Sequence, residues 1–397
     1  MAVVSASALA GILSAVARFR GAAVPVVVLE LVFGVLLGPH VIGLHVTPFL
    51  SFFSDLGLGL LFFFAGYEID LHRIRGMPLR LGMLGWAVSL AVAYSVGGVL
   101  AAAGVVLSLI YTGSALASTA LGTLLPILSD AGQMRTRLGT YLLGAGAVGE
   151  FGPVLLVTLV LSAQSTLHNG LILGAFIVIV VAVAVLTLRL SHQTVPMFKR
   201  TIEASSQVAV RSALVLVFAL AFLAYKLGLD LLLGGFAAGM ITRQLLKRSE
   251  LPEFDSKLNA IAFGVFVPFF FIVSGMKLDV TALFASPSGV AKCLLFFVLF
   301  FVVRGTPALL LYRRVLGRRQ QLALAFFSAT QLPLVVAITD LATASGHMRA
   351  STAAALVGAA VLSTLVYPLV GISFATQATA TVVPPGPDAY VERYGVR

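Results

Sequence analysis

The chain has 397 residues, of which 59% are hydrophobic and 10% are charged, and its mean hydropathy is +1.06. A soluble domain is about 45–50% apolar and about 25% charged, so the composition excludes an ordinary soluble protein. Disorder is excluded as well, because disordered chains are poor in hydrophobic residues. The single cysteine, Cys293, excludes an intramolecular disulfide and any Cys-x-x-Cys metal or redox site. The sequence therefore predicts an integral membrane protein that crosses the bilayer many times.

Apolar runs of membrane-crossing length divide the chain into thirteen predicted helices. Their approximate limits are 2–17, 25–43, 50–66, 81–103, 105–128, 138–163, 170–188, 208–225, 229–242, 258–276, 289–312, 320–343 and 352–374. We expect the first helix to be retained, because no small-residue cleavage site follows it. The predicted fold is all-α and polytopic. It ends in a short cytoplasmic tail at residues 377–397, which is too short for a nucleotide-binding domain.

Basic residues gather in every second predicted loop, as they do in cytoplasmic loops. Loops after even-numbered helices hold only Lys226, Lys277 and Arg349. Loops after odd-numbered helices, with the tail, hold twenty: Arg18, Arg20, Arg73, Arg75, Arg80, Arg135, Arg137, Arg189, Lys199, Arg200, Arg243, Lys247, Arg248, Lys257, Arg313, Arg314, Arg318, Arg319, Arg393 and Arg397. This predicts an external N-terminus and a cytoplasmic C-terminus. The net charge of +11 then indicates contact with anionic lipid headgroups and not nucleic-acid binding.

A short motif recurs in two predicted helix ends. Phe62, Gly66 and Asp70 lie in LFFFAGYEIDL, and the same three residue types recur 209 positions later in FFIVSGMKLDV. The first copy ends a helix on the inside and the second ends one on the outside. Inverted repeats of this kind are typical of secondary transporters.

The following spans of both repeats carry polar residues just before a proline: residues 115–128 read ALASTALGTLLPIL, and residues 325–338 read AFFSATQLPLVVAI. A proline inside a helix removes a backbone donor and clashes with the preceding turn, so we predict helix breaks at Pro126 and Pro333. Two ordinary kinked helices are the alternative, but the matched positions favour two broken helices that cross near the middle of the membrane. Freed backbone groups, or an ion, would contact Ser118, Thr119, Thr123, Ser328, Thr330 and Gln331.

Few ionisable residues fall inside the predicted spans, and each costs about 2.5–3.5 kcal/mol at a helix centre, so each is a functional candidate. Glu150 lies near the middle of the sixth span and Arg304 well inside the eleventh. A proton and a cation would compete for Glu150, because burial favours the neutral carboxyl group and a bound cation favours the carboxylate. Arg304 keeps its charge, so we expect it to compensate charge and orient the crossing helices. A permanent Glu150–Arg304 pair is the alternative.

The remaining charged residues of the spans lie in the second span or near span ends. Glu30, in the second span, either lines the inner funnel or pairs with Arg18 or Arg20. Four others lie near span ends, where we expect them to reach water or headgroups: Asp230, Lys292, Asp340 and Arg211. Glycines at positions 34, 38, 235 and 239 are expected to let helices pack closely.

Five stretches together resemble the monovalent cation:proton antiporter-2 family of the larger sodium/proton exchanger superfamily. They are GVLLGP (34–39), FFFAGYEIDLHRIR (62–75), ALASTALGTLLPIL (115–128), LLLGGFAAG (231–239) and VPFFFIVSGMKLD (267–279). The resemblance implies a sodium/proton antiporter-like fold and a homodimer with a mobile, elevator-type core. Residues 1–80 and 208–288 would form the dimerisation scaffold, 81–165 and 289–376 the core, and 166–207 the linking helix.

The resemblance also implies an ion site. Glu150 matches the family's ion-carrying carboxylate, Gly149 replaces its acidic or Asn neighbour, and Arg304 stands where related chains often have Lys. A monovalent cation would bind at Glu150 and Thr119, with Ser118, Thr330 and Gln331 nearby. One carboxylate beside an arginine implies exchange of one proton for one cation, electroneutral overall.

The leading hypothesis is thus a multi-pass antiporter of the cell membrane that exchanges Na⁺ or K⁺ for H⁺ without a cofactor. A separate regulatory subunit is left open. The alternatives are a proton-coupled carrier of a small organic solute, a channel, and a non-transporting sensor or scaffold with a buried Glu150–Arg304 pair. An enzyme is not expected, since no Ser/His/Asp set, HExxH motif or catalytic carboxylate pair occurs at membrane depth.

Overall fold

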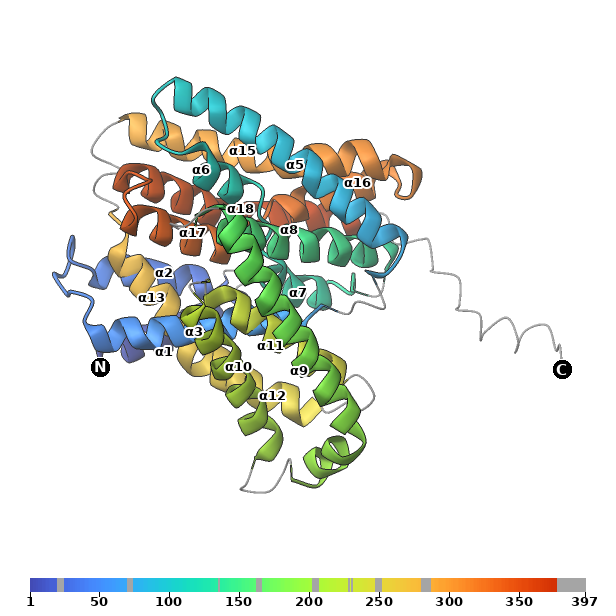
Figure 1. Cartoon of the computed structure of the whole chain (residues 1–397). Helices are drawn as coiled ribbons and strands as arrows, with labels where there is room; N and C mark the ends of the chain where they lie inside the picture. The colour runs from blue at the N-terminus through green and yellow to red at the C-terminus, as the bar shows by residue number, and fades with distance from the viewer. Residues whose placement is uncertain are drawn as a thin grey trace.

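The computed structural model describes residues 1–19, 25–69, 74–134, 136–161, 166–201, 207–227, 229, 231–246, 252–279 and 287–376. Every regular element in these ranges is a helix, which confirms the all-α prediction (Figure 1). In chain order these are α1 (Ala2–Phe19), α2 (Val26–Leu37), α3 (Pro48–Tyr67), α5 (Met77–Ala102), α6 (Leu109–Leu116), α7 (Leu121–Asp130), α8 (Arg137–Leu161), α9 (Thr166–Thr201), α10 (Val208–Lys226), α11 (Leu231–Leu246), α12 (Pro252–Ile261), the π-helical η1 (Ala262–Phe266), α13 (Val267–Lys277), α15 (Pro287–Leu311), the 3₁₀ turn η2 (Tyr312–Arg314), α16 (Arg318–Ala329), α17 (Pro333–Ala344) and α18 (Ala350–Thr376).

Helix starts follow local chemistry where the sequence supplies it. The Thr47 hydroxyl accepts the backbone N–H of Leu50 at 3.3 Å and so caps α3, which opens with Pro48. The helix α5 follows Gly76, whose φ of 86° lies in the left-handed region that glycine tolerates. These signals place the starts of α3 and α5 where the apolar runs begin.

Seven of the described helical segments are long and apolar enough to cross a membrane. Five shorter apolar stretches, mostly helical, lie at Ala2–Ala17, Val26–Leu37, Leu109–Leu124, Leu171–Thr187 and Leu232–Leu246, and the third of these contains the end of α6 and the start of α7. Each of the thirteen predicted ranges overlaps a described helix, but the ends differ. The helix α2 stops at Leu37 and not near residue 43, and α9 runs to Thr201 and not to 188. The number of membrane crossings stays a prediction.

The helices pack in two groups (Figure 1). In one group α2 and α3 pack on α13, α3 also packs on α11, and α10 packs on α11. In the other group α5 packs on α8 and α15, and α15, α16 and α18 pack on one another. The long helix α9 contacts α10 and α11 of the first group and α8 of the second. The helix α9 thus touches both groups, and the assignment of the two groups to a scaffold and a core stays a prediction.

Two helix pairs of the first group meet in the same way. A Cβ atom on Gly34 of α2 would lie 2.1 Å from the Ile272 carbonyl oxygen of α13, and one on Gly239 of α11 would lie 1.9 Å from the Phe63 carbonyl oxygen of α3. Only glycine permits such close backbone approach. Because Phe63 and Ile272 each directly follow the repeated phenylalanine, the α2–α13 and α11–α3 contacts are equivalent. The internal repeat is therefore present in the packing as well as in the sequence.

Large apolar side chains remain exposed along several helices. Examples are Val215 and Phe222 of α10, Met83 and Leu84 of α5, and Val178 of α9. A soluble protein seldom exposes so much apolar surface, whereas lipid chains cover it at no cost. The exposed faces fit the expectation of an integral membrane protein.

Candidate ion-binding site

Two helices of the second group are interrupted. The helix α6 ends at Leu116 and α7 begins at Leu121, with non-helical backbone at 117–120 between them. The helix α16 ends at Ala329 and α17 begins at Pro333, with non-helical backbone at 330–332. Pro333 therefore lies at the start of a half-helix. Pro126 does not mark a break as predicted, because α7 continues through it and the interruption lies upstream.

The two interruptions are hydrogen-bonded to each other. The Ala120 N–H donates to the Thr330 carbonyl at 2.9 Å, and the Gln331 side-chain amide donates to the Leu116 carbonyl at 3.0 Å. The Thr119 hydroxyl donates to the carbonyl of Ser328 at 2.7 Å. Carbonyl groups at helix ends have no partner within their own helix, so these bonds satisfy groups that the breaks release. Tertiary hydrogen bonds thus hold both interruptions in place.

The polar side chains predicted near the interruptions hydrogen-bond mainly to backbone carbonyl groups there. The Ser118 hydroxyl donates to the Ala115 carbonyl at 2.8 Å and lies 3.1 Å from the Gln331 Oε1. The Thr330 hydroxyl turns back to the Phe326 carbonyl at 3.3 Å. Of the two uses expected for these groups, the structure displays the bonding of freed backbone. Their contact with an ion stays a prediction.

Glu150 is buried in α8 beside the first interruption. Only 6% of its surface is exposed. The backbone N–H of Leu121, the first residue of α7, hydrogen-bonds to its carboxyl group. The Oε2 atom is buried and has no hydrogen-bond partner. The positive end of α7 therefore faces a carboxyl group that still has one oxygen free to bind a proton or a cation.

Arg304 of α15 is buried next to the same interruption. Its Nε donates to the Thr119 hydroxyl at 2.9 Å, its Nη1 to the Ser89 hydroxyl at 3.2 Å, and its Nη2 to the Ala145 carbonyl at 3.2 Å. All three acceptors are uncharged. Among the described residues Arg304 forms no ion pair with Glu150, so the permanent pair that the sequence left open is absent. Arg304 joins α15 to α5, α8 and the α6–α7 interruption.

The close approach at Gly149 explains why that position lacks a side chain. A Cβ atom there would lie 2.3 Å from Arg304 Nη2 and 2.9 Å from the Thr119 hydroxyl oxygen. An acidic residue or Asn at this position would need the guanidinium group to move. The absence of a side chain at Gly149 thus leaves room for the guanidinium group of Arg304.

Sequence reasoning missed a second carboxyl group at this place. Glu68 follows α3, and its Oε2 lies 3.7 Å from where a Cβ atom of Gly122 would be. This oxygen is buried and has no hydrogen-bond partner. Glu68 interacts electrostatically with Glu150 and with Arg243 of α11. The Arg243 guanidinium in turn lies 5.5 Å from the centre of the Tyr67 ring.

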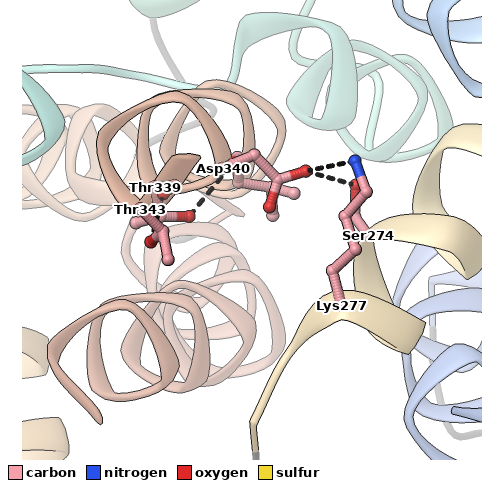
Figure 2. Close-up of polar contacts among 6 residues, drawn as sticks. Ser274, Lys277, Thr339, Asp340 and Thr343 are labelled. Carbon is pink, nitrogen blue, oxygen red and sulfur yellow. Dashed lines mark hydrogen bonds and ion pairs between the residues drawn. The ribbon is translucent and has the colours of Figure 1, made fainter. Parts of the chain in front are cut away.

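Two other charged residues that the sequence analysis singled out, Asp340 and Glu30, lie on α17 and α2. Asp340 of α17 contacts another helix: its Oδ2 lies 3.7 Å from Lys277 Nζ and accepts the Ser274 hydroxyl at 3.3 Å (Figure 2). This contact joins α17 to α13 across the two groups. Glu30 is buried in α2. Its suggested pairing with Arg18 or Arg20, like the roles of Asp70 and Asp230, falls on side chains outside the described part of the chain.

Comparison with known proteins assigns the family. Residues 4–375 match the sodium/hydrogen exchanger transmembrane family, so the chain belongs to the sodium/hydrogen exchanger family. The Na⁺/H⁺-K⁺ antiporter GerN of Bacillus cereus is 28% identical over 262 residues, which cover 64% of this chain and 65% of that protein. The probable Na⁺/H⁺ antiporter 3 of Methanocaldococcus jannaschii is 27% identical over 272 residues, covering 66% and 67%. This chain thus aligns with about two thirds of the length of these relatives.

A solved structure supports the same fold over almost the full length. The sodium proton antiporter MjNhaP1 from Methanocaldococcus jannaschii, determined at pH 8, superposes with a TM-score of 0.65 at 15% identity. The superposition covers 94% of this chain and 96% of that chain. The antiporter-like fold and the family resemblance expected from the sequence are confirmed.

Proposed function

We propose that the protein is a secondary active antiporter that exchanges a monovalent cation, Na⁺ or K⁺, for H⁺ across the cell membrane. The observation that carries this proposal is the Glu150 carboxyl group, which is buried at the interrupted helices with one oxygen bonded and one oxygen free. A buried carboxylate without a counter-charge is unfavourable, so the free oxygen binds either a proton or a cation. Binding of a cation then releases the proton, and binding of a proton releases the cation.

The charges around Glu150 suit one-for-one exchange. Arg304 cannot deprotonate and is held by three uncharged acceptors, so its charge stays constant through the cycle. Glu150 alternates between a protonated form and a cation-bound form, which carry the same total charge. Exchange of one proton for one cation is therefore electroneutral, with the constant charge of Arg304, next to Gly149, as compensation.

The two helix groups suit alternating access by an elevator motion. The interruptions, Glu150 and Arg304 all belong to the group of α5, α8, α15, α16 and α18, so this core would carry the site as one unit. The tightly packed glycine contacts of α2, α3, α11 and α13 suit a static scaffold that forms the homodimer. The helix α9, which contacts both groups, would link them.

The names of related proteins support the choice of substrate. GerN is a Na⁺/H⁺-K⁺ antiporter, and a 27% identical relative from Enterococcus hirae is a Na⁺/H⁺ antiporter. A cytoplasmic C-terminus, as the distribution of basic residues predicts, completes the proposed arrangement in the membrane.

The test is proton flux in liposomes that contain the purified protein and a pH gradient, with Na⁺, K⁺, Li⁺ or choline added in turn. We expect flux with Na⁺ or K⁺, no flux with choline, and loss of flux in Glu150→Gln. Glu253→Gln is the matched control, because Glu253 is an exposed glutamate of α12. Absence of proton flux with every alkali ion, in folded and dimeric protein, would contradict the proposal. It would favour an organic-solute carrier or a non-transporting role.

A further inference from the structure

Two carboxylate contacts lie at the end of α13, which faces the external side under the predicted topology. Lys277 is the last residue of this helix, and its Nζ lies 3.7 Å from Oδ2 of Asp340 on α17. Asp279 follows the helix, and its Oδ1 lies 3.7 Å from Nε2 of His40, which follows α2. The helix α17 packs on α18 of the second group, whereas α2 and α13 both belong to the first. The two contacts are alike in distance and position, but only the first joins the two groups.

The contact between the groups depends on the charge of Lys277. Figure 2 shows Lys277 and Ser274 of α13 reaching across to Asp340, which also accepts the Ser274 hydroxyl at 3.3 Å. Asp55 of α3 interacts electrostatically with both Lys277 and Asp340. The carboxylates of Asp55 and Asp340 repel each other, because both are negative. Loss of the Lys277 ammonium would therefore turn attraction between the two groups into repulsion.

The helix α17 connects this contact to the candidate ion site. It begins at Pro333, directly after the interruption at 330–332, and its 12 residues make a helix about 18 Å long. Beyond its other end, the Ser345 hydroxyl lies 3.3 Å from the hydroxyl of Tyr111 on α6. Both ends of α17 are thus attached to the second group. A contact between Asp340 and α13 therefore fixes the position of the whole core, and with it the ion site, relative to the scaffold.

We propose that Lys277 and Asp340 form an external latch that stabilises the core position of this structure and opens in every transport cycle. The proposal rests on the proposed antiport and adds to it a named contact that separates when the core moves. The pair is partly exposed, so its attraction is modest and is screened by salt. It can therefore break within a cycle and still shift the ratio of the two core positions by up to about fivefold. The contact of His40 with Asp279 stays intact, because both residues move with the scaffold.

A distance measurement tests the latch without transport. Spin labels on Ala344→Cys of α17 and His45→Cys of the loop before α3, both exposed positions, report the separation of the two groups in a Cys293→Ala background. We expect Lys277→Gln to lower the ratio of the latched to the unlatched distance by up to about fivefold, and His40→Gln to leave it unchanged. Added choline chloride should lower the ratio in the protein that keeps Lys277 and not in Lys277→Gln. Equal distance distributions with and without Lys277 would overturn the inference.

A reversible cross-link tests whether the latch opens during exchange. In the Cys293→Ala background, a short bifunctional methanethiosulfonate reagent that joins Lys277→Cys to Asp340→Cys should stop proton flux in liposomes, and reduction should restore it. The same reagent across His40→Cys and Asp279→Cys, a contact of equal length within one group, should leave the flux unchanged.

The outcomes separate the latch from antiport. Continued flux in cross-linked Lys277→Cys/Asp340→Cys, or loss of flux in both cross-linked pairs, would overturn the latch. Absence of flux with every alkali ion in the wild type would contradict antiport, and the spin-label distances would still decide whether the latch exists.

Discussion

Asp340 of α17 and Lys277 of α13 form an ion pair, with Oδ2 and Nζ 3.7 Å apart (Figure 2). The pair joins the helix group that carries Glu150 to the group proposed as scaffold. Asp55 of α3 interacts electrostatically with both partners. The side chains of Lys277 and Asp340 are 45% and 31% exposed, so the pair contributes at most about 1 kcal/mol. Its importance is therefore for the relative position of the two groups and not for folding.

A charge swap tests this pair. Asp340→Lys places two ammonium groups together, and Lys277→Asp places three carboxylates together, so each should lower the Tm by about 2 °C and slow exchange. The double variant restores opposite charges and should recover most of both losses. Thermal unfolding and liposome flux are the measurements. Additive losses in the double variant would contradict a direct interaction between the two residues.

The close glycine contacts predict that the effect of a glycine-to-alanine substitution on stability depends on the position. Gly34→Ala and Gly239→Ala should destabilise the protein by about 1–3 kcal/mol or more, since each new methyl group would overlap a backbone carbonyl of the facing helix. Gly98→Ala is the control, because nothing lies within 4 Å of its Cβ position on α5. There alanine should be neutral or stabilising by up to about 1 kcal/mol. Equal Tm shifts at the three positions would show that the close approach is wrong.

The three hydrogen bonds of Arg304 predict that lysine at this position cannot replace arginine. Arg304→Lys keeps the charge but cannot reach Thr119, Ser89 and the Ala145 carbonyl together, because one ammonium group replaces three separated donors. We expect a loss of about 1–3 kcal/mol, measured as a lower Tm, together with slower exchange. Lys292→Gln, on the same helix α15 but only half-buried, should change neither. Full activity and stability in Arg304→Lys would mean that charge alone matters.

Several parts of this site could be predicted from the sequence because they depend on local patterns of residues. The interruption at Pro333 follows from the missing backbone donor of proline, and Glu150 stands out as a carboxyl group in a long apolar run. The other interruption was predicted at Pro126 but lies at 117–120, where hydrogen bonds from Thr119 and Ala120 to the facing break hold the backbone. Such bonds depend on which helices meet, and local sequence does not encode that.

The surroundings of Glu68 and Asp340 could not be predicted from the sequence for a related reason. Glu68 lies one residue beyond α3, and nothing in the local sequence indicates that Gly122 of α7 packs next to it. Asp340 lies near a span end, where water or headgroups are the usual partners, yet it meets Lys277 from a distant helix. In both cases the side chain's environment is set by tertiary packing. The repeated motif in FFFAGYEID was the one sequence signal near Glu68.

Electroneutral exchange predicts independence from membrane voltage. If Glu150 alternates between one proton and one cation beside a constant Arg304, no net charge moves, and the initial rate should be the same at zero and at imposed potentials. Liposomes clamped with a K⁺ ionophore and assayed with Na⁺ provide the measurement. A rate that follows the voltage, or a current on cation addition, would contradict the one-for-one stoichiometry.

The most direct measurement of the central claim is proton release on cation binding. Purified protein in weakly buffered detergent solution should release about one proton for each Na⁺ or K⁺ bound, because both compete for the free oxygen of Glu150. Glu150→Gln should release none, whereas Glu253→Gln should match the wild type. Cation binding without proton release in the wild type, or undiminished release in folded Glu150→Gln, would contradict the account.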